Sequence, residues 1–302
     1  MSVALTKDDI FEVIKSNDCI VFIGSGLSST IYPNWNKTVD KLCEACGVPK
    51  PESSEPYKLL AKVDECRKSN IKRYKDTMLE IFGKPVVNIR RAYYLLFKLP
   101  FRAYITFNFD PLLWTAAIDQ RRQRPSLYIY PGELPVPGLR SSDKKPIYYI
   151  HGMVNPEDPS IIDNLVFSNE TFEKAYKEDS PLHSFITQVL LYCPTIFIGY
   201  SFSEPLTRET FRRVHRIWSK LETSYPVEKQ RKLFALLAYR YKNNKRDKEF
   251  EETENKRWNE VGINVVRYDP IDKNHSGVEK FLDNLLEKLE TDEEEEILYG
   301  SK

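Results

Sequence analysis

The chain has almost no net charge, few cysteines and only short apolar runs near its amino terminus, and each scarcity excludes a class of protein. Its 45 Lys and Arg residues nearly equal its 44 Asp and Glu residues, so no chain-wide attraction to nucleic acid or an anionic membrane is expected. The apolar run at residues 19–23 is far below the roughly 18 residues that a membrane helix needs. We therefore expect no membrane contact, nucleic-acid contact only indirectly if at all, and a cytoplasmic protein.

Cysteine and glycine are also scarce. The five cysteines form an odd, unevenly spaced set, which fits reduced thiols better than a disulfide framework. Cys43 and Cys46 form a single Cys-x-x-Cys pair with no second pair, so we interpret them as buried thiols. With only 11 glycines in 302 residues, close pairs such as Gly24 and Gly26 carry information about tight turns.

Short apolar segments alternate with segments of helical periodicity, which predicts a sheet with helical crossovers. The expected strands are nearly continuous in apolar residues, as in a parallel sheet buried on both faces. They are residues 19–23, 103–106, 147–150, 195–198, 233–237 and 263–268. Helices are expected at residues 7–16, 35–46, 87–96, 111–118, 181–191, 204–221 and 278–289. The predicted fold class is α/β, a Rossmann-like parallel sheet flanked by helices, with a helical insertion.

Three segments depart from this alternation. A helical insertion of about residues 49–95, polar and without a clear strand in its first part, is expected inside one domain that spans residues 1–290. Residues 119–145 are rich in Pro, Arg and Ser and are expected to form a long surface connection. Residues 291–302 are expected to be a solvated acidic tail.

Four motifs stand where expected strands end, which is the edge at which open α/β sheets bind ligands. The first is Gly24-Ser25-Gly26-Leu27-Ser28. Its glycines let the backbone approach a phosphate, and its serines add hydroxyl donors near a helix start. The alternative is a turn that serves only the packing of the strand. The third glycine and the acidic residue of the dehydrogenase fingerprint are missing, which disfavours hydride transfer.

The second and third motifs contribute polar side chains at the same edge. Asn108 stands between Phe107 and Phe109 directly after a strand, and Asp110 follows the second phenylalanine, so both are in position to face a cleft. Asp110 is explained equally well as the N-cap of a helix that begins at Pro111. His151, followed by Gly152, is either a cleft residue or a hydrogen-bonded core histidine.

The fourth motif is Gly199-Tyr200-Ser201-Phe202, which closes another strand. It does not match the Gly-x-Ser-x-Gly elbow of serine hydrolases, because Ser203 stands where that pattern has glycine. Ser201 is therefore interpreted as a binding group and not as a nucleophile.

In this order the four motifs resemble the sirtuin superfamily, whose pattern runs Gly-Ala-Gly-x-Ser, Thr-Gln-Asn-x-Asp, His-Gly and Gly-x-Ser. The likeness spans about residues 15–290. Deacylating sirtuins carry two zinc-binding Cys-x-x-Cys pairs between the third and fourth motifs, where this chain has Cys193 alone. Residues 32–35, Tyr-Pro-Asn-Trp, stand where deacylases have an Asp-Phe-Arg segment. These departures resemble the zinc-less bacterial defence-associated branch, whose members hydrolyse NAD in phage-infected cells.

The resemblance implies an NAD glycohydrolase that uses NAD as substrate and no metal, as the toxic effector of an anti-phage abortive-infection system. It assigns His151 as the base, a task that an ordinary histidine pKa of about 6.5 suits. It assigns Asn108 to orienting ribose and water, and Asp110 to the nicotinamide end. The cofactor-binding set is completed by Gly24, Ser25, Gly26 and Ser28 at the pyrophosphate and by Gly199, Tyr200 and Ser201 toward the adenosine. Glu204 replaces an aspartate usual in this branch and receives no catalytic role.

Two other functions remain open. One is an NAD or ADP-ribose sensor or assembly subunit whose catalysis is silent until a partner activates it, and the less favoured one is an NAD-dependent protein deacylase. The resemblance also implies a homo-oligomer and a HerA-type ATPase or another defence-system partner. A basic stripe on the helix at residues 204–221 could contact nucleic acid or an acidic partner, although a solvated helix face is the commoner cause. The stripe consists of Arg208, Arg212, Arg216 and Lys220.

Overall fold

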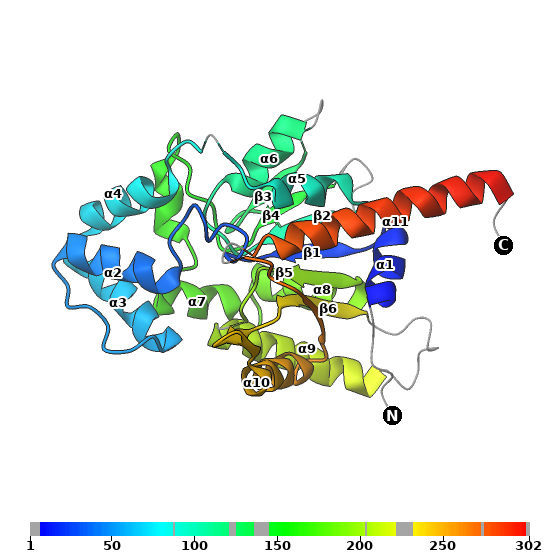
Figure 1. Cartoon of the computed structure of the whole chain (residues 1–302). Coiled ribbons are helices and arrows are strands. Elements are labelled where there is room, and N and C mark those ends of the chain that lie inside the picture. Colours follow the sequence, from blue (N-terminus) through cyan, green and yellow to red (C-terminus); the bar gives the residue numbers. More distant parts are fainter. Residues whose placement is uncertain are drawn as a thin grey trace.

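The structure is a computed structural model that describes residues 7–86, 88–120, 125–135, 145–202, 204–221, 232–272 and 275–299, with side chains up to residue 292. Within these ranges seven parallel strands form one sheet in the order β3-β4-β2-β1-β5-β6-β9 (Figure 1). The strands are β1 (Ile20–Ile23), β2 (Ala103–Thr106), β3 (Leu127–Ile129), β4 (Ile147–Tyr149), β5 (Thr195–Ile198), β6 (Leu233–Ala238) and β9 (Asn264–Tyr268). All six expected strands are present and the predicted fold class is confirmed.

The prediction of a long surface connection at residues 119–145 is wrong in part, because the strand β3 lies within it. This segment, of which residues 121–124 and 136–144 lie outside the described ranges, contributes a strand that pairs in parallel with β4 at the edge of the sheet. Pro125 and Pro131 enclose a run of only three strand residues, a composition that looks like a loop. Proline is nevertheless tolerated beside an edge strand, because one side of that strand has no ladder partner.

Helices cover both faces of the sheet. The helices α1 (Lys7–Lys15), α5 (Arg91–Lys98), α6 (Leu112–Gln120) and α11 (Gly277–Tyr299) pack on the face that receives Val21 and Ile23 of β1. The helices α7 (Asn169–Tyr176), α8 (Pro181–Tyr192), α9 (Pro205–Leu221) and α10 (Lys248–Asn259) pack on the face that receives Ile20 and Phe22. This alternation follows from the two-residue period of a strand and explains why β1 is apolar throughout.

A helical module lies beyond the carboxyl ends of the strands (Figure 1). It consists of α2 (Trp35–Cys46), α3 (Pro56–Ser69) and α4 (Ile71–Phe82), and α3 also packs against α7. A short 3₁₀ helix, η1 (Pro159–Asn164), packs against α4. The module therefore includes α2, which precedes the expected insertion at residues 49–95, and does not include α5, which packs against α6 and α11 on the sheet.

Two segments near the carboxyl end also differ from expectation. The helix α11 continues through Tyr299, so the expected acidic tail at residues 291–302 is helical over its described part, with residues 300–302 outside the described ranges. Ion pairs tie α11 to α1, with Lys15 2.5 Å from Asp292 and Lys288 2.8 Å from Asp8. The exposed run after β6 forms a small hairpin of β7 (Tyr241–Lys242) and β8 (Lys245–Arg246). In the described part of the chain no helix combines the length and apolarity needed to span a bilayer.

Candidate functional site

The turns that follow β1 and β5 are in direct contact. The backbone N–H of Gly26 donates a hydrogen bond of 2.7 Å to the carbonyl oxygen of Gly199. A β-carbon at position 24 would lie 2.5 Å from the same oxygen, so only glycine fits there without moving the backbone. Gly199 has φ +67°, a left-handed conformation that glycine adopts without strain. The strand order reverses at this point, since β2 lies on one side of β1 and β5 on the other, and such switch points open ligand crevices.

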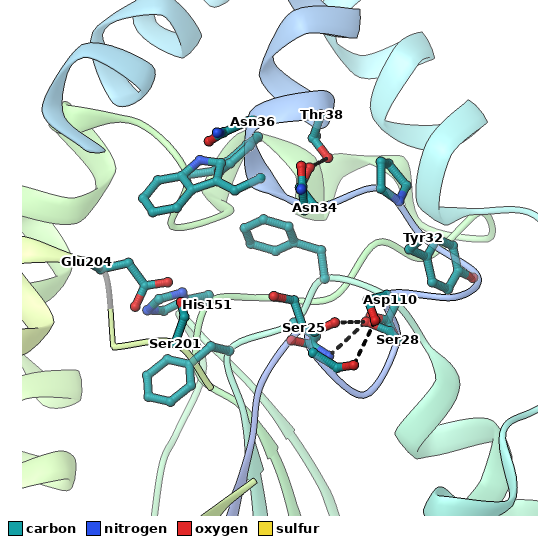
Figure 2. Close-up of a pocket in the computed structure, with 18 of the residues that line it drawn as sticks. Ser25, Ser28, Tyr32, Asn34, Asn36, Thr38, Asp110, His151, Ser201 and Glu204 are labelled. Carbon is teal, nitrogen blue, oxygen red and sulfur yellow. Dashed lines mark hydrogen bonds between the residues drawn. The ribbon is translucent and has the colours of Figure 1, made fainter. Parts of the chain in front are cut away.

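A cleft of about 470 Å³ opens above this contact, between the sheet edge and the helical module (Figure 2). Its volume is within the range of small-molecule sites. Nine of the ten predicted site residues line it, namely Ser25, Gly26, Ser28, Asn108, Asp110, His151, Gly199, Tyr200 and Ser201. The tenth, Gly24, lies in the backbone contact beneath the cleft.

A second, smaller recess of about 180 Å³ adjoins the cleft. The two share Gly26, Ser29, Gly199, Tyr200 and Ser201, so they meet at the glycine-rich turns. Beyond these turns the smaller recess extends along the carboxyl ends of β6 and β9. It is lined there by Leu236, Leu237, Ala238 and Tyr268, together with Arg90, Arg240, Glu254, His275 and Val278.

Asp110 satisfies both interpretations that the sequence leaves open. Its Oδ1 accepts the backbone N–H of Leu112 at 3.2 Å, as expected of a cap for α6, and the residue also lines the cleft. Burial raises the pKa of Asp110 to about 6, although hydrogen bonds involving Leu112, Ser28 and Asn108 favour the carboxylate. A buried carboxyl group beside a cleft is suited to receiving a polar ligand group.

Asn108 is held by the two neighbouring strand ends. Its backbone N–H donates to Thr106 Oγ1 at 3.1 Å, and its side-chain amide donates to Ser28 Oγ at 3.4 Å. The Ser28 hydroxyl in turn donates to the carbonyl oxygen of Ser25 at 3.2 Å. The turns after β1 and β2 therefore form one hydrogen-bonded unit that fixes the amide of Asn108 at the cleft.

His151 lies in a box of aromatic rings and is only 2% exposed. The rings of Phe107, Phe172 and Tyr176 meet the imidazole edge to face, with centroids 5.1, 5.1 and 5.8 Å away. Its Nε2 is 2.7 Å from the Tyr176 hydroxyl, so Nδ1 is the ring nitrogen left for a ligand. Burial lowers the pKa of His151 to about 3, which corrects the expectation of an ordinary value near 6.5. His151 is therefore a neutral group at the pH of a cell.

Glu204 is a site residue to which the sequence analysis gave no role. It lines the cleft, and one of its carboxylate oxygens, Oε2, accepts a hydrogen bond from the Tyr200 hydroxyl. Burial raises the pKa of Glu204 to about 7, and the hydrogen bond from Tyr200 counters part of that increase. Glu204 stands directly before Pro205 at the start of α9, where a carboxylate is easily explained as a helix cap. The signal available in the sequence was its position three residues after Ser201.

The segment after the first motif adds two unsatisfied polar groups to the wall. Tyr32 and Trp35 line the cleft, and Trp35 stacks on Phe172 with an interplanar angle of 16°. Within the described residues neither the Tyr32 hydroxyl nor the Trp35 indole N–H has a hydrogen-bond partner, although both atoms are buried. Buried polar groups are normally paired, so these two are suited to pairing with a bound ligand.

Two further predictions concern metals and the basic stripe. Among the described residues no group of three or more His, Cys, Asp or Glu side chains is arranged to hold a metal ion. All five cysteines are buried free thiols in the described chain, and Cys43 and Cys66 meet in the helical module with their sulfurs 3.9 Å apart.

On α9, Arg212 pairs with Glu260 at 3.3 Å and Arg216 with Glu209 at 2.7 Å, as on an ordinary solvated face.

The family model of the SIR2-like domain matches residues 102–266, which is more than half of the chain. The matched region begins just before β2 and contains the motifs of Asn108, His151 and Gly199 as well as Glu204. No curated protein shows significant similarity to the chain. With the parallel sheet, the paired glycine turns and the cleft above them, the chain belongs to the SIR2-like domain family.

Proposed function

We propose that the chain is an NAD glycohydrolase, which cleaves NAD to nicotinamide and ADP-ribose. The observation that carries this proposal is the meeting of two recesses at the glycine-rich turns, with Asn108, Asp110 and His151 all lining the larger one. A dinucleotide has two ring-bearing ends joined by a pyrophosphate, and it fits two recesses that meet at glycine-rich turns. Membership of the SIR2-like domain family supports binding of NAD in general.

In this proposal the nicotinamide riboside occupies the larger cleft and the adenosine the smaller recess. The turn at residues 24–29 cradles the pyrophosphate, because Gly26 and Ser29 line both recesses and therefore stand at their junction. The carboxamide of nicotinamide pairs with Asp110 and with the unsatisfied hydroxyl of Tyr32, whose electrostatic contact with Asp110 puts the two groups at one end of the cleft.

Cleavage of this bond needs little general-acid catalysis from the protein. The nicotinamide of NAD is already a cationic leaving group, so the demand is to stabilise an oxocarbenium-like transition state and to admit one water molecule. Asn108 orients the ribose and the water, since its amide is fixed by Ser28. Neutral His151 hydrogen-bonds a ribose hydroxyl through Nδ1 without adding positive charge beside the developing cation.

The decisive experiment measures nicotinamide release from NAD by chromatography, with and without an acetylated peptide. Release without peptide supports the glycohydrolase, and we expect it to persist in the presence of a chelator. Release that requires the peptide supports a deacylase. Tight binding without release supports the sensor, the other alternative that the sequence leaves open.

We further propose that the activity serves as the toxic effector of an anti-phage abortive-infection system in the bacterial cytoplasm. The support is the resemblance of the four motifs to the zinc-less defence-associated branch, whose members act as oligomers, some with a HerA-type ATPase. Induced expression in bacteria, with a phage challenge, should deplete cellular NAD, whereas an Asn108→Ala chain should not. NAD levels that stay equal in the two cultures would contradict this role.

A further inference from the structure

The carboxylate of Glu204 is aimed into the cleft and is held on one side only. Its Oε2 accepts a hydrogen bond from Tyr200, while Oε1 has no hydrogen-bond partner within the described ranges. The Tyr200 ring cannot swing away easily, because it stacks on Phe107 with centroids 4.4 Å apart and an interplanar angle of 12°. Figure 2 shows Glu204, His151 and Ser201 on one wall of the cleft, facing Ser25 and Asp110 across it. Oε1 is therefore a carboxylate oxygen open to whatever occupies the cleft.

Two other titratable groups of the cleft, His151 and Asp110, are engaged in contacts that compete with taking a proton from water. His151 has Nε2 committed to Tyr176, and its burial makes the imidazolium costly. Asp110, whose pKa is raised to about 6, accepts the N–H of Leu112 at the start of α6 and is also held by hydrogen bonds involving Ser28 and Asn108. Glu204, by contrast, combines an open oxygen with a pKa of about 7, the range in which a general base works best.

We propose that Glu204 is the general base of the reaction and that its Oε1 takes a proton from the water that attacks the ribose. This inference rests on the proposed NAD glycohydrolase function. The water oxygen forms a bond to C1′ of the ribose as the bond from C1′ to the nicotinamide nitrogen breaks, and its electron pair neutralises the pyridinium ring. The water proton moves to Glu204 and is then released to solvent, so the products are ADP-ribose, nicotinamide and one proton. Tyr200 is a positioning residue that turns Oε1 toward the cleft.

The charged and titratable groups around Glu204 determine the expected pH dependence. They are Tyr200 after β5, Tyr176 on α7, His151 after β4, and Arg208 one turn along α9. Tyr176 and Tyr200 have pKa values raised well above the ordinary value by burial, so both stay protonated, and His151 stays neutral. Glu204 is thus the group among these that changes charge near pH 7.

The test compares the pH profile of kcat for nicotinamide release in the wild type, Glu204→Gln and the control Glu209→Gln. Glu209 is on the same helix but pairs with Arg212 and Arg216 away from the cleft. We expect kcat of the wild type and of Glu209→Gln to rise with pH through about 7. Glu204→Gln should lose on the order of 100-fold or more in kcat at pH 8 and lose the rising limb. Its Kd for ADP-ribose, measured by calorimetry, should not change.

Two further variants keep the test decisive if Glu204→Gln does not fold by circular dichroism. Tyr200→Phe removes the hydrogen bond that lowers the pKa of Glu204, so the rising limb should move to higher pH. Glu204→Ala should regain part of its activity when formate is added as an external base. Near-normal kcat with the limb intact in Glu204→Gln, or an unmoved limb in Tyr200→Phe, overturns the inference and leaves the glycohydrolase proposal standing. A wild type that binds NAD but releases no nicotinamide overturns both.

Discussion

His151 Nε2 and the hydroxyl of Tyr176 lie 2.7 Å apart inside a box of aromatic rings. Because burial lowers the pKa of His151 to about 3, we expect its imidazole resonances to show no protonation in an NMR titration from pH 8 to pH 5. The pKa of His183 on α8 is also lowered by burial and by Arg213, so this histidine serves as an internal reference for a partly buried imidazole. Titration of His151 near pH 6.5 would contradict the neutral histidine of this account.

Removal of the Tyr176 hydroxyl should destabilise the protein and weaken its activity. In Tyr176→Phe the buried Nε2 of His151 loses its hydrogen-bond partner, which costs about 1–3 kcal/mol of unfolding free energy. The imidazole also loses the contact that fixes its orientation toward the cleft, so kcat for nicotinamide release should fall. Urea unfolding and the release assay check the two effects, and Tyr192→Phe, an exposed tyrosine on α8, is the matched control. Equal stability of Tyr176→Phe and the wild type would show that this hydrogen bond contributes nothing.

Glu204 should reduce the stability of the folded chain at alkaline pH. Its pKa is raised from an unfolded value of about 4.3 to about 7, so the folded state binds the proton more tightly than the unfolded state does. The stabilisation from this proton is complete below pH 4 and is lost as the pH rises through 7. Glu204→Gln should therefore be more stable than the wild type at pH 8, by on the order of 1–3 kcal/mol, and equally stable near pH 4. Thermal unfolding at the two pH values measures this difference, and a pH-independent difference would contradict the raised pKa.

The contact between the two glycine turns should tolerate no side chain. In Gly24→Ala the new β-carbon would meet the Gly199 carbonyl oxygen at 2.5 Å, and since this atom is backbone, the turns must separate. We expect loss of NAD binding together with a fall in unfolding temperature. Gly47→Ala is the matched control, because Gly47 has φ +68° and nothing within 4 Å of the added carbon, so it should cost only about 1–2 kcal/mol and leave binding intact. Unchanged NAD affinity in Gly24→Ala would show that the contact does not shape the site.

The strands and the glycine turns were predictable because they depend on local sequence. Continuous apolar runs identified β1 and β5, and the scarce glycines marked the turns that follow them. The strand β3 was missed because flanking prolines mask a run of three residues. The helix α10 was also not predicted. Its sequence shows no helical period, because Trp258 is the one apolar residue that it buries.

The protonation properties of the site could not be predicted from the motifs. The order of the motifs indicated Asn108 and His151, and both line the cleft. The neutral state of His151 depends on Phe172 and Tyr176, which come from a helix that the sequence reasoning did not identify. The raised pKa of Glu204 likewise depends on burial in the assembled fold, whereas its sequence position indicates only a helix cap.

The most direct test of the central claim is nicotinamide release by Asn108→Ala, compared with the wild type at saturating NAD. Asn108 is 7% exposed and donates to Ser28, so alanine removes the amide that orients ribose and water while the sheet stays intact. We expect the wild type to release nicotinamide without an acylated peptide. Asn108→Ala should lose release by on the order of 100-fold or more and still bind ADP-ribose. Near-normal release by a folded Asn108→Ala, or none from the wild type, would contradict this claim.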